Sequence, residues 1–153
     1  MPSFPTLLLR AVIHASFLLP ATAVRAQGDQ PPAAAKDHFA QQYPGAVVKE
    51  WEKKTKHYKV EFKLKDEKYE AHYALDGAWV RTEHDVPKST LPPTITGALK
   101  AGKYASWKVK DVEQHATPQH AVLYKVEVEK DERKMEVFFT PDGQVLREQE
   151  GSK

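Results

Sequence analysis

The tetrapeptide Tyr58-Lys59-Val60-Glu61 recurs as Tyr124-Lys125-Val126-Glu127, and these two stretches decide the fold. The turn pair Asp76-Gly77 recurs as Asp142-Gly143, and both matches have the same offset of 66 residues. A shared offset indicates that the whole intervening segment is duplicated, because a chance match of one motif would not bring a second one with it. The sequence therefore predicts two tandem repeats of one structural unit.

Each repeat is predicted to be one helix followed by a four-stranded antiparallel sheet, which makes the chain an α+β protein. In the first repeat, Pro31-Pro32 precede apolar residues at four-residue spacing, which predict a helix over residues 33–42. In the second repeat, Pro92-Pro93 begin a helix that is expected to run to about Lys103. Proline suits the first helical turn because its missing N–H has no intrahelical partner there.

The strands are predicted from alternating apolar and charged side chains over residues 58–64 and 124–129. This period of two is typical of antiparallel strands with one buried face. We interpret the other face as a solvated ladder of lysines and glutamates that pair across strands. The two Asp-Gly pairs predict tight turns with glycine in the left-handed conformation, and the second turn would place Phe139 and Val145 on one face.

The two repeats differ in the length of their first hairpin. Before the shared tetrapeptide, Tyr43 matches Tyr104 at an offset of 61, so the second repeat holds five extra residues between Val112 and Tyr124. We expect an extended hairpin tip around residues 115–120. Such a tip is either a site of specific contact or a tolerated surface insertion.

Residues 1–26 are predicted to be a signal peptide. Arg10 supplies a positive charge, and the segment 11–24 is mostly apolar but too short to cross a bilayer. Val24-Arg25-Ala26 provides a cleavage site, so the mature chain would begin at Gln27. The alternative for this apolar segment is a buried N-terminal helix. Because no later segment is apolar enough to span a membrane, we expect a periplasmic or secreted protein.

Composition excludes several classes of function. The signal segment holds two arginines and no acidic residue, so the net charge of +2 falls to zero in the mature chain. A neutral chain argues against a nucleic-acid or anionic-membrane partner. The chain has no cysteine, which excludes disulfides and thiolate chemistry. The mature chain is expected to form two domains, 27–85 and 86–153, with a linker around residues 83–91.

No motif in the chain predicts catalysis or a cofactor. The mature chain has no Gly-x-Ser-x-Gly motif and no glycine-rich phosphate loop. The carboxylates alternate with lysines, which is typical of a solvated face rather than an acid–base pair. The histidines form no His-x-His or His-Glu-x-x-His motif, and the pair His115 and His120 could at most hold a divalent cation weakly. We therefore predict no catalytic residue, no cofactor and no metal site.

Apolar residues on the sheet face opposite the helices are candidates for partner binding. By alternation, His72 and Val80 of the first repeat and Phe138 and Leu146 of the second fall on that face. Such a strip is either a contact surface for a partner or a surface covered by the other lobe or by a second copy of the chain. With the extended hairpin included, the candidate partner-binding residues are His72, Val80, Phe138, Leu146, His115 and His120.

Short motifs along the chain carry a resemblance to a known family. They are Tyr43-Pro44-Gly45-Ala46, Trp51-Glu52, Tyr58-Lys59-Val60-Glu61-Phe62, Asp76-Gly77-Ala78-Trp79 and the second set from Tyr124 to Leu146. This tandem pattern resembles the PepSY-like, beta-lactamase-inhibitor-like family of bacterial export compartments. The resemblance implies two units of one helix and a four-stranded sheet, and an inhibitor-like role through the open sheet face. The second repeat departs from the pattern, because Tyr104-Ala105-Ser106 replaces Tyr-Pro-Gly.

The sequence therefore favours an exported, non-catalytic protein that binds a protein or peptide partner. Two alternatives stay open: a small enzyme or weak metal-responsive module that uses the His115/His120 hairpin, and a structural component of the envelope. An enzyme requires polar groups that converge in a pocket. A binding sheet instead requires exposed apolar contacts with a polar rim.

Export gives the first testable prediction. Mass spectrometry of the protein from the periplasmic or secreted fraction should show an N-terminus at Gln27, because the apolar segment ends at the cleavage site Val24-Arg25-Ala26. Replacing Ala26 by a bulky residue should shift or slow the cleavage. An intact Met1 in the soluble fraction would show that the segment is not a signal peptide.

Overall fold

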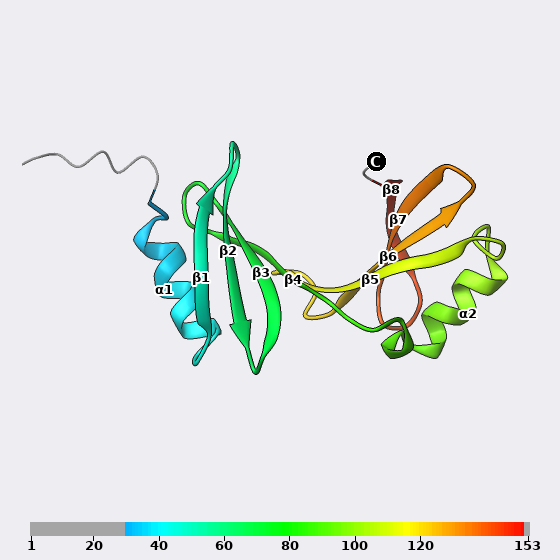
Figure 1. Cartoon of the computed structure of the whole chain (residues 1–153), viewed down its shortest axis with the longest axis horizontal. Helices are drawn as coiled ribbons and strands as arrows, with labels where there is room; N and C mark the ends of the chain where they lie inside the picture. Colours follow the sequence, from blue (N-terminus) through cyan, green and yellow to red (C-terminus); the bar gives the residue numbers. More distant parts are fainter. Residues whose placement is uncertain (1–29, 152–153) are drawn as a thin grey trace, which may run out of the picture.

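The computed structural model describes residues 30–151 (Figure 1). The predicted signal peptide at 1–26 lies outside the described residues. Among the helices of the described part, none is both long and apolar enough to cross a membrane.

Residues 30–151 form one eight-stranded antiparallel sheet and two α-helices, so the predicted α+β class is confirmed. The strands pair in chain order, and the sheet twists strongly from β1 to β8 (Figure 1). The first half of the protein consists of α1 (Ala33–Gln42), β1 (Val47–Lys53), β2 (His57–Leu64), β3 (Glu67–Ala74) and β4 (Trp79–Asp85). The second half consists of α2 (Pro93–Ala101), β5 (Lys108–Ala116), β6 (Leu123–Lys130), β7 (Arg133–Phe139) and β8 (Val145–Glu150).

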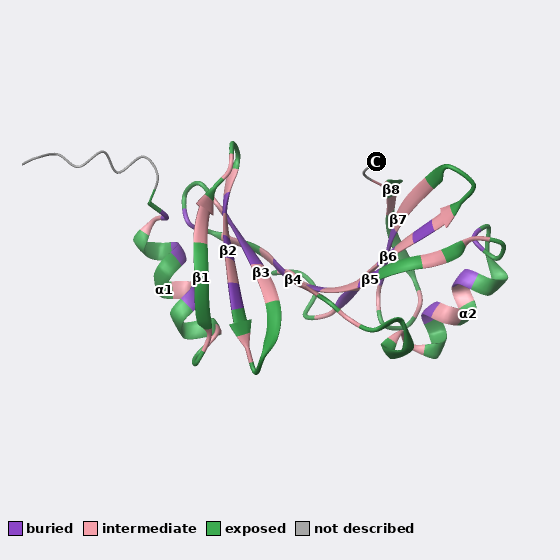
Figure 2. Ribbon diagram, in the orientation of Figure 1, coloured by how far each residue is buried: buried purple, intermediate pink, exposed green. Residues whose placement is uncertain are grey.

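Each helix packs its apolar residues on the strands of its own half. Phe39 of α1 is buried in one apolar cluster, and Ile95 and Leu99 of α2 are buried in another. In Figure 2, the buried residues lie on α1 and α2 and within the strands that they cover. The cluster of the first half is Ala35, Phe39, Tyr58, Val60, Phe62, Ala71 and Tyr73, and that of the second half is Ile95, Leu99, Tyr104, Val112, Val126, Val128, Val137 and Phe139.

The two halves join through backbone pairing of β4 with β5. Thr82 pairs with Ala116, and the pairing continues to Asp85 with Glu113. The strands therefore form one sheet, where the sequence pattern had described a four-stranded sheet for each repeat. We refer to this β4–β5 pairing as the seam.

The five extra residues of the second half lengthen the hairpin that makes the seam. Trp51 pairs with Val60 in the first half, and Val112 pairs with Val126 at the matching position of the second. Beyond Val112, β5 continues to Ala116, and it is this extension that pairs with β4. The insertion is thus more than a surface loop, because part of it builds the junction between the halves. The predicted linker began too early, since Glu83 to Asp85 belong to β4.

The two duplicated glycines have the predicted left-handed conformation, with φ of 94° at Gly77 and 90° at Gly143. Both turns lie against the start of a helix. The hydroxyl of Thr94 in α2 donates a 2.6 Å hydrogen bond to the carbonyl of Pro141 in the second turn. A Cβ added at Gly143 would lie 2.9 Å from the Thr94 carbonyl oxygen, and one added at Gly77 would lie 3.1 Å from the Ala35 nitrogen. Glycine is therefore required by the backbone angle and also by the close approach of the helix.

Replacing Gly77 or Gly143 by valine should lower the free energy of unfolding by at least about 1–2 kcal/mol, through left-handed strain and the helix contact. Chemical denaturation measures the loss. The matched control is Gly97→Ala, because Gly97 lies within α2 and a Cβ there meets nothing within 4 Å. Alanine should stabilise that helix by about 1 kcal/mol. Wild-type stability of both valine variants would refute the turn assignment.

Candidate functional site

The sheet has one face that neither helix covers, which we call the open face. Val60, Ala71 and Val126 belong to the clusters under the helices. Because side chains alternate along a strand, their neighbours point to the opposite side of the sheet. Charged side chains dominate this side, and they come from all eight strands.

The register of the sheet arranges these side chains in rows that run across the strands, and the pattern occurs in both halves. One row, which we call the mixed row, is Glu52, Lys59, His72 and Arg81 in the first half and Glu113, Lys125, Phe138 and Arg147 in the second. The next row, the acidic row, is Glu50, Glu61, Glu70 and Glu83 in the first half and Asp111, Glu127, Glu136 and Gln149 in the second. Adjacent carboxylates on neighbouring strands repel one another, so such a row requires nearby cations.

Two lysines of the mixed row supply much of that charge. Lys59 Nζ lies 2.6 Å from Glu61 and 3.5 Å from Glu70, and Lys125 contacts Glu113 and Glu136 in the same way. The hydrogen bonds from Lys49 and Lys59 lower the pKa of Glu61 to about 2.

The interpretation of this face as a solvated ladder is wrong for its centre. Only 14% of the Lys59 side chain and 18% of the Lys125 side chain are exposed. Lys59 lies on β2 and Lys125 on β6, each between two other strands, so side chains of the adjacent strands cover much of both lysines.

Glu83 lies at the point where the two halves meet. Its Oε1 is 3.1 Å from Nε2 of His72 on β3, and its Oε2 is 3.8 Å from Nε2 of His115 on β5. Arg81 Nε donates to Glu83 Oε2 at 2.5 Å. Burial by itself would raise the pKa of Glu83, but the hydrogen bonds from His72 and Arg81 hold it well below its usual range. Glu83 is therefore a carboxylate at neutral pH, and it links three strands.

Glu113 has a similar position on the other side of the seam. Its Oε2 is 2.8 Å from Nε2 of His115, and Lys125 binds its other oxygen. Burial would raise the pKa of Glu113, but the hydrogen bonds from His115 and Lys125 outweigh burial and lower it. Asp85 pairs directly with Glu113 across the seam, and burial together with the charges of Asp111 and Glu113 raises the pKa of Asp85. The second half of the seam is thus crowded with negative charge.

The first half also has a groove with a volume of about 700 Å³, which open-face side chains line together with Phe62, Tyr69 and His84. Glu61, Glu70 and Glu83 of the acidic row line it, together with Glu113 from the second half. Its lining also includes Val47 and Val48 of β1 and the lysines Lys49, Lys63 and Lys68. The lining of the groove therefore combines carboxylates with apolar and basic side chains.

The predicted site residues, four on the open face and two in the hairpin, differ widely in their exposure. His72, His115 and Phe138 are buried, with 5%, 5% and 7% of their surface exposed. Val80 and Leu146 are 41% and 43% exposed, so they do not share the environment of the buried three.

Both exposed residues lie at irregularities in the strand pairing. Register shifts between His72 and Tyr73 and between Phe138 and Phe139 leave Val80 and Leu146 without a partner position. As a consequence Arg147, rather than Leu146, is opposite Phe138, with its guanidinium 4.0 Å from the ring centroid. The extra residue shifts the side-chain alternation of β8, and a partner-binding role for Leu146 stays a prediction.

The predicted pair of hairpin histidines is also separated. His115 lies within β5 and faces Glu83 and Glu113, while His120 lies in the exposed turn that follows. Among the described residues, the groups of three or more candidate ligands that come within 4.8 Å do not include His120.

Sequence reasoning missed the carboxylates and arginines that organise this face. It assigned no role to Glu70, Glu83, Glu113, Arg81 or Arg147. One available signal was the 66-residue offset, which aligns His72 with Phe138 and Glu83 with Gln149. Positions at which duplicated segments differ are natural candidates for a specific role.

Comparisons with known proteins agree on the family and the fold. The family described as "Putative beta-lactamase-inhibitor-like, PepSY-like" matches residues 22–69 and again residues 61–147. A search of curated proteins found no match.

Several solved structures are similar. A DUF2874 family protein from Bacteroides ovatus is 29% identical, with a TM-score of 0.68 over 80% of this chain and 89% of that one. A BLIP-like protein from Bacteroides fragilis is 26% identical, with a TM-score of 0.69 over 79% of this chain and 86% of that one. A protein from Bacteroides eggerthii described as "putative periplasmic" is 22% identical, with a TM-score of 0.66 over 79% and 89% of the two chains, and it shows the fold alone.

Acid should weaken the seam through Glu113. Because the pKa of Glu113 is lowered in the folded protein, its ionisation adds stability above the unfolded value of roughly 4.3 and this contribution is lost as the pH falls below that value. The titratable groups that face Glu113 are His115, Lys125, Asp85, Asp111 and Glu83. Melting temperature measured from pH 7 to pH 3 should fall less steeply in Glu113→Gln than in wild type.

The control is Glu132→Gln, which changes an exposed glutamate in the turn between β6 and β7. Its melting curve should follow that of wild type at every pH. If the melting temperature of Glu113→Gln falls as steeply with pH as that of wild type, the ionisation of Glu113 is not coupled to folding.

Proposed function

Because the chain belongs to the PepSY-like, beta-lactamase-inhibitor-like family, we propose that it is a non-catalytic protein that binds a protein or peptide partner through its open face. The family and the similarity to a BLIP-like protein favour an inhibitor-like role. A broad face that no helix covers is suited to a macromolecule rather than to a small molecule.

Arg147 is the observation that carries this proposal. It is exposed, it lies over the buried Phe138 ring, and within the described residues no carboxylate pairs with it. At the matching position of the first half, Arg81 binds Glu83, whereas Gln149 takes the place of that glutamate beside Arg147. A guanidinium that is held by a ring but not neutralised can bind a carboxylate of a partner. Arginine and aromatic residues are enriched at the energetic centres of protein interfaces.

The groove of the first half gives the open face a second and opposite charge. Glu61, Glu70 and Glu83 of the acidic row line it, together with the exposed Val47 and Val48. A partner that fits would present a basic or apolar segment to the groove and an acidic group to Arg147. Such complementarity fixes the orientation of binding more than it adds affinity.

We further propose that the chain acts outside the cytoplasm, in the periplasm or as a secreted protein. The sequence of residues 1–26 supports this through its signal-peptide pattern. Domains 27–85 and 86–153 would then act as one binding unit, because the seam joins them in one sheet.

Charge reversal at Arg147 should weaken partner binding strongly without disturbing the fold. Wild type, Arg147→Glu and the control Lys100→Glu are immobilised, and an envelope extract and a panel of purified beta-lactamases are passed over each. Lys100 is exposed on α2, away from the open face. A partner should bind wild type and Lys100→Glu alike, and should bind Arg147→Glu with roughly thirtyfold lower affinity, as expected for the loss of about 2 kcal/mol at an interface centre.

Two further measurements complete this test. Circular dichroism should give closely similar melting temperatures for all three proteins, because Arg147 has no ion-pair partner to lose and its contact with the Phe138 ring contributes only about 0.5–1 kcal/mol at an exposed site. If wild type, and not Arg147→Glu, inhibits the hydrolysis of a beta-lactam substrate by one of the beta-lactamases, the partner class is identified. Equal retention of every ligand by wild type and Arg147→Glu would contradict the assignment of the open face as the binding surface.

A further inference from the structure

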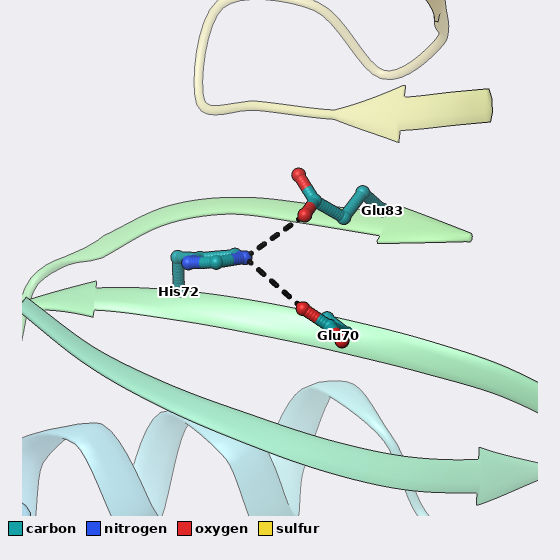
Figure 3. Close-up of side chains that lie close together, drawn as sticks. All are labelled: Glu70, His72 and Glu83. Carbon is teal, nitrogen blue, oxygen red and sulfur yellow. Dashed lines mark hydrogen bonds and ion pairs between the residues drawn. The ribbon is translucent and has the colours of Figure 1, made fainter. Parts of the chain in front are cut away.

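Three potential metal ligands converge on the open face of the first half. Nε2 of His72 lies 3.1 Å from Glu83 Oε1 and 3.9 Å from Glu70 Oε2. Figure 3 shows both carboxylates directed at the same ring nitrogen, one from β3 and one from β4. The His72 ring is 5% exposed, so the nitrogen is held in place by its surroundings. Imidazole nitrogen with two carboxylate oxygens is a donor set that Zn²⁺ accepts in proteins.

We propose that His72, Glu70 and Glu83 form a binding site for a divalent transition cation of the Zn²⁺ class. The sequence had predicted no metal site, since these three residues belong to no ligand motif. In a tetrahedral zinc site with bonds of about 2.0–2.1 Å, neighbouring ligand atoms lie roughly 3.4 Å apart. The separations of 3.1 and 3.9 Å lie on either side of that value, so small side-chain rotations would complete the site.

The positively charged side chains nearby contact the other oxygen of each carboxylate, the one that does not face His72. Arg81 binds Oε2 of Glu83, and Lys59 lies 3.5 Å from Oε1 of Glu70. The oxygens that face His72 are therefore left to the proposed ion. Arg81 Nη2 is 3.3 Å from His72 Nε2 and is the group that an incoming cation would displace. Because the Arg81 side chain is 37% exposed, it can withdraw into solvent.

The ion would also have a path from solvent and room for a water ligand. Glu70 and Glu83 both line the groove of about 700 Å³, and the Glu70 side chain is 41% exposed. A site with three protein ligands and one solvent-filled position is a common arrangement for zinc. The many carboxylates nearby, including Glu61 and Glu113 in the same groove, favour the accumulation of cations.

The second half of the protein supplies an internal reference for this site. At the 66-residue offset, Glu70 corresponds to Glu136, but His72 corresponds to Phe138 and Glu83 to Gln149. The same strand positions therefore carry one carboxylate and two side chains that are poor ligands. The two halves share one backbone framework and differ in the side chains that the proposed ion needs. The second half is therefore expected not to bind the ion.

A neighbouring group of candidate ligands shares Glu83 but is less available. It consists of Glu83, Glu113 and His115. The Glu83 oxygen on that side, Oε2, is the one that Arg81 binds. We therefore assign one ion per chain, at His72.

Isothermal titration calorimetry with Zn²⁺ on the untagged, metal-free chain tests the site. Wild type should bind one equivalent, and His72→Phe should bind at least about tenfold more weakly, because a direct ligand is lost. This variant should fold, since phenylalanine is the residue at the matching position of the second half. His120→Ala, which alters the exposed histidine of the β5–β6 turn, should bind as wild type does.

Two more variants sharpen the result. Arg81→Ala should bind Zn²⁺ more tightly than wild type, because a competing positive charge is removed. Phe138→His combined with Gln149→Glu should gain a second equivalent beside Glu136. If His72→Phe does not fold, Glu83→Gln replaces it and should show the same loss.

Equal Zn²⁺ binding by wild type and the His72 or Glu83 variant would overturn the proposal, as would a stoichiometry that follows His120. The outcome is independent of partner binding, which Arg147→Glu tests on the other half of the face.

Discussion

The pairing of β4 with β5 is the interaction on which the rest of the structure depends. Without it, the protein would be two small lobes, each with its own helix and its own exposed sheet edge. With it, Glu83 on β4 lies against His115 on β5, and the open faces of the two halves become one surface. The extra residues of the first hairpin of the second half make this pairing geometrically available, because they extend β5 beyond Val112.

The two faces of the sheet are stabilised by different physical effects. Under the helices, apolar side chains such as Val60 and Val126 are fully buried, and this burial supplies the main driving force for folding. On the open face, isolated ion pairs would contribute little. The partial burial of Lys59 and Lys125 among carboxylates changes that balance, because each charge then depends on its neighbours. The open face is consequently ordered without being apolar.

The functional differences between the halves arise where a common framework has diverged. His72 and Phe138 occupy matching places, yet one contacts two carboxylates and the other lies beneath Arg147. The change from Glu83 to Gln149 has the complementary effect on the neighbouring arginine, which is neutralised in the first half and not in the second. One scaffold thus presents a site that attracts cations beside a site that attracts anions. Both properties follow from a few side chains on equivalent strand positions, and the backbone is the same.

The sequence by itself determined the elements, because their signals are local. Proline pairs and apolar spacing gave α1 as Ala33–Gln42 and α2 to within two residues, and the Asp-Gly pairs gave the left-handed turns at Gly77 and Gly143. Only the tertiary structure decided which side chains meet on the open face. A single extra residue in β8 placed Arg147 beside Phe138, and the seam brought Glu83 between two histidines. Such contacts depend on strand register and on pairing between distant segments, and alternation within one strand carries no information about either.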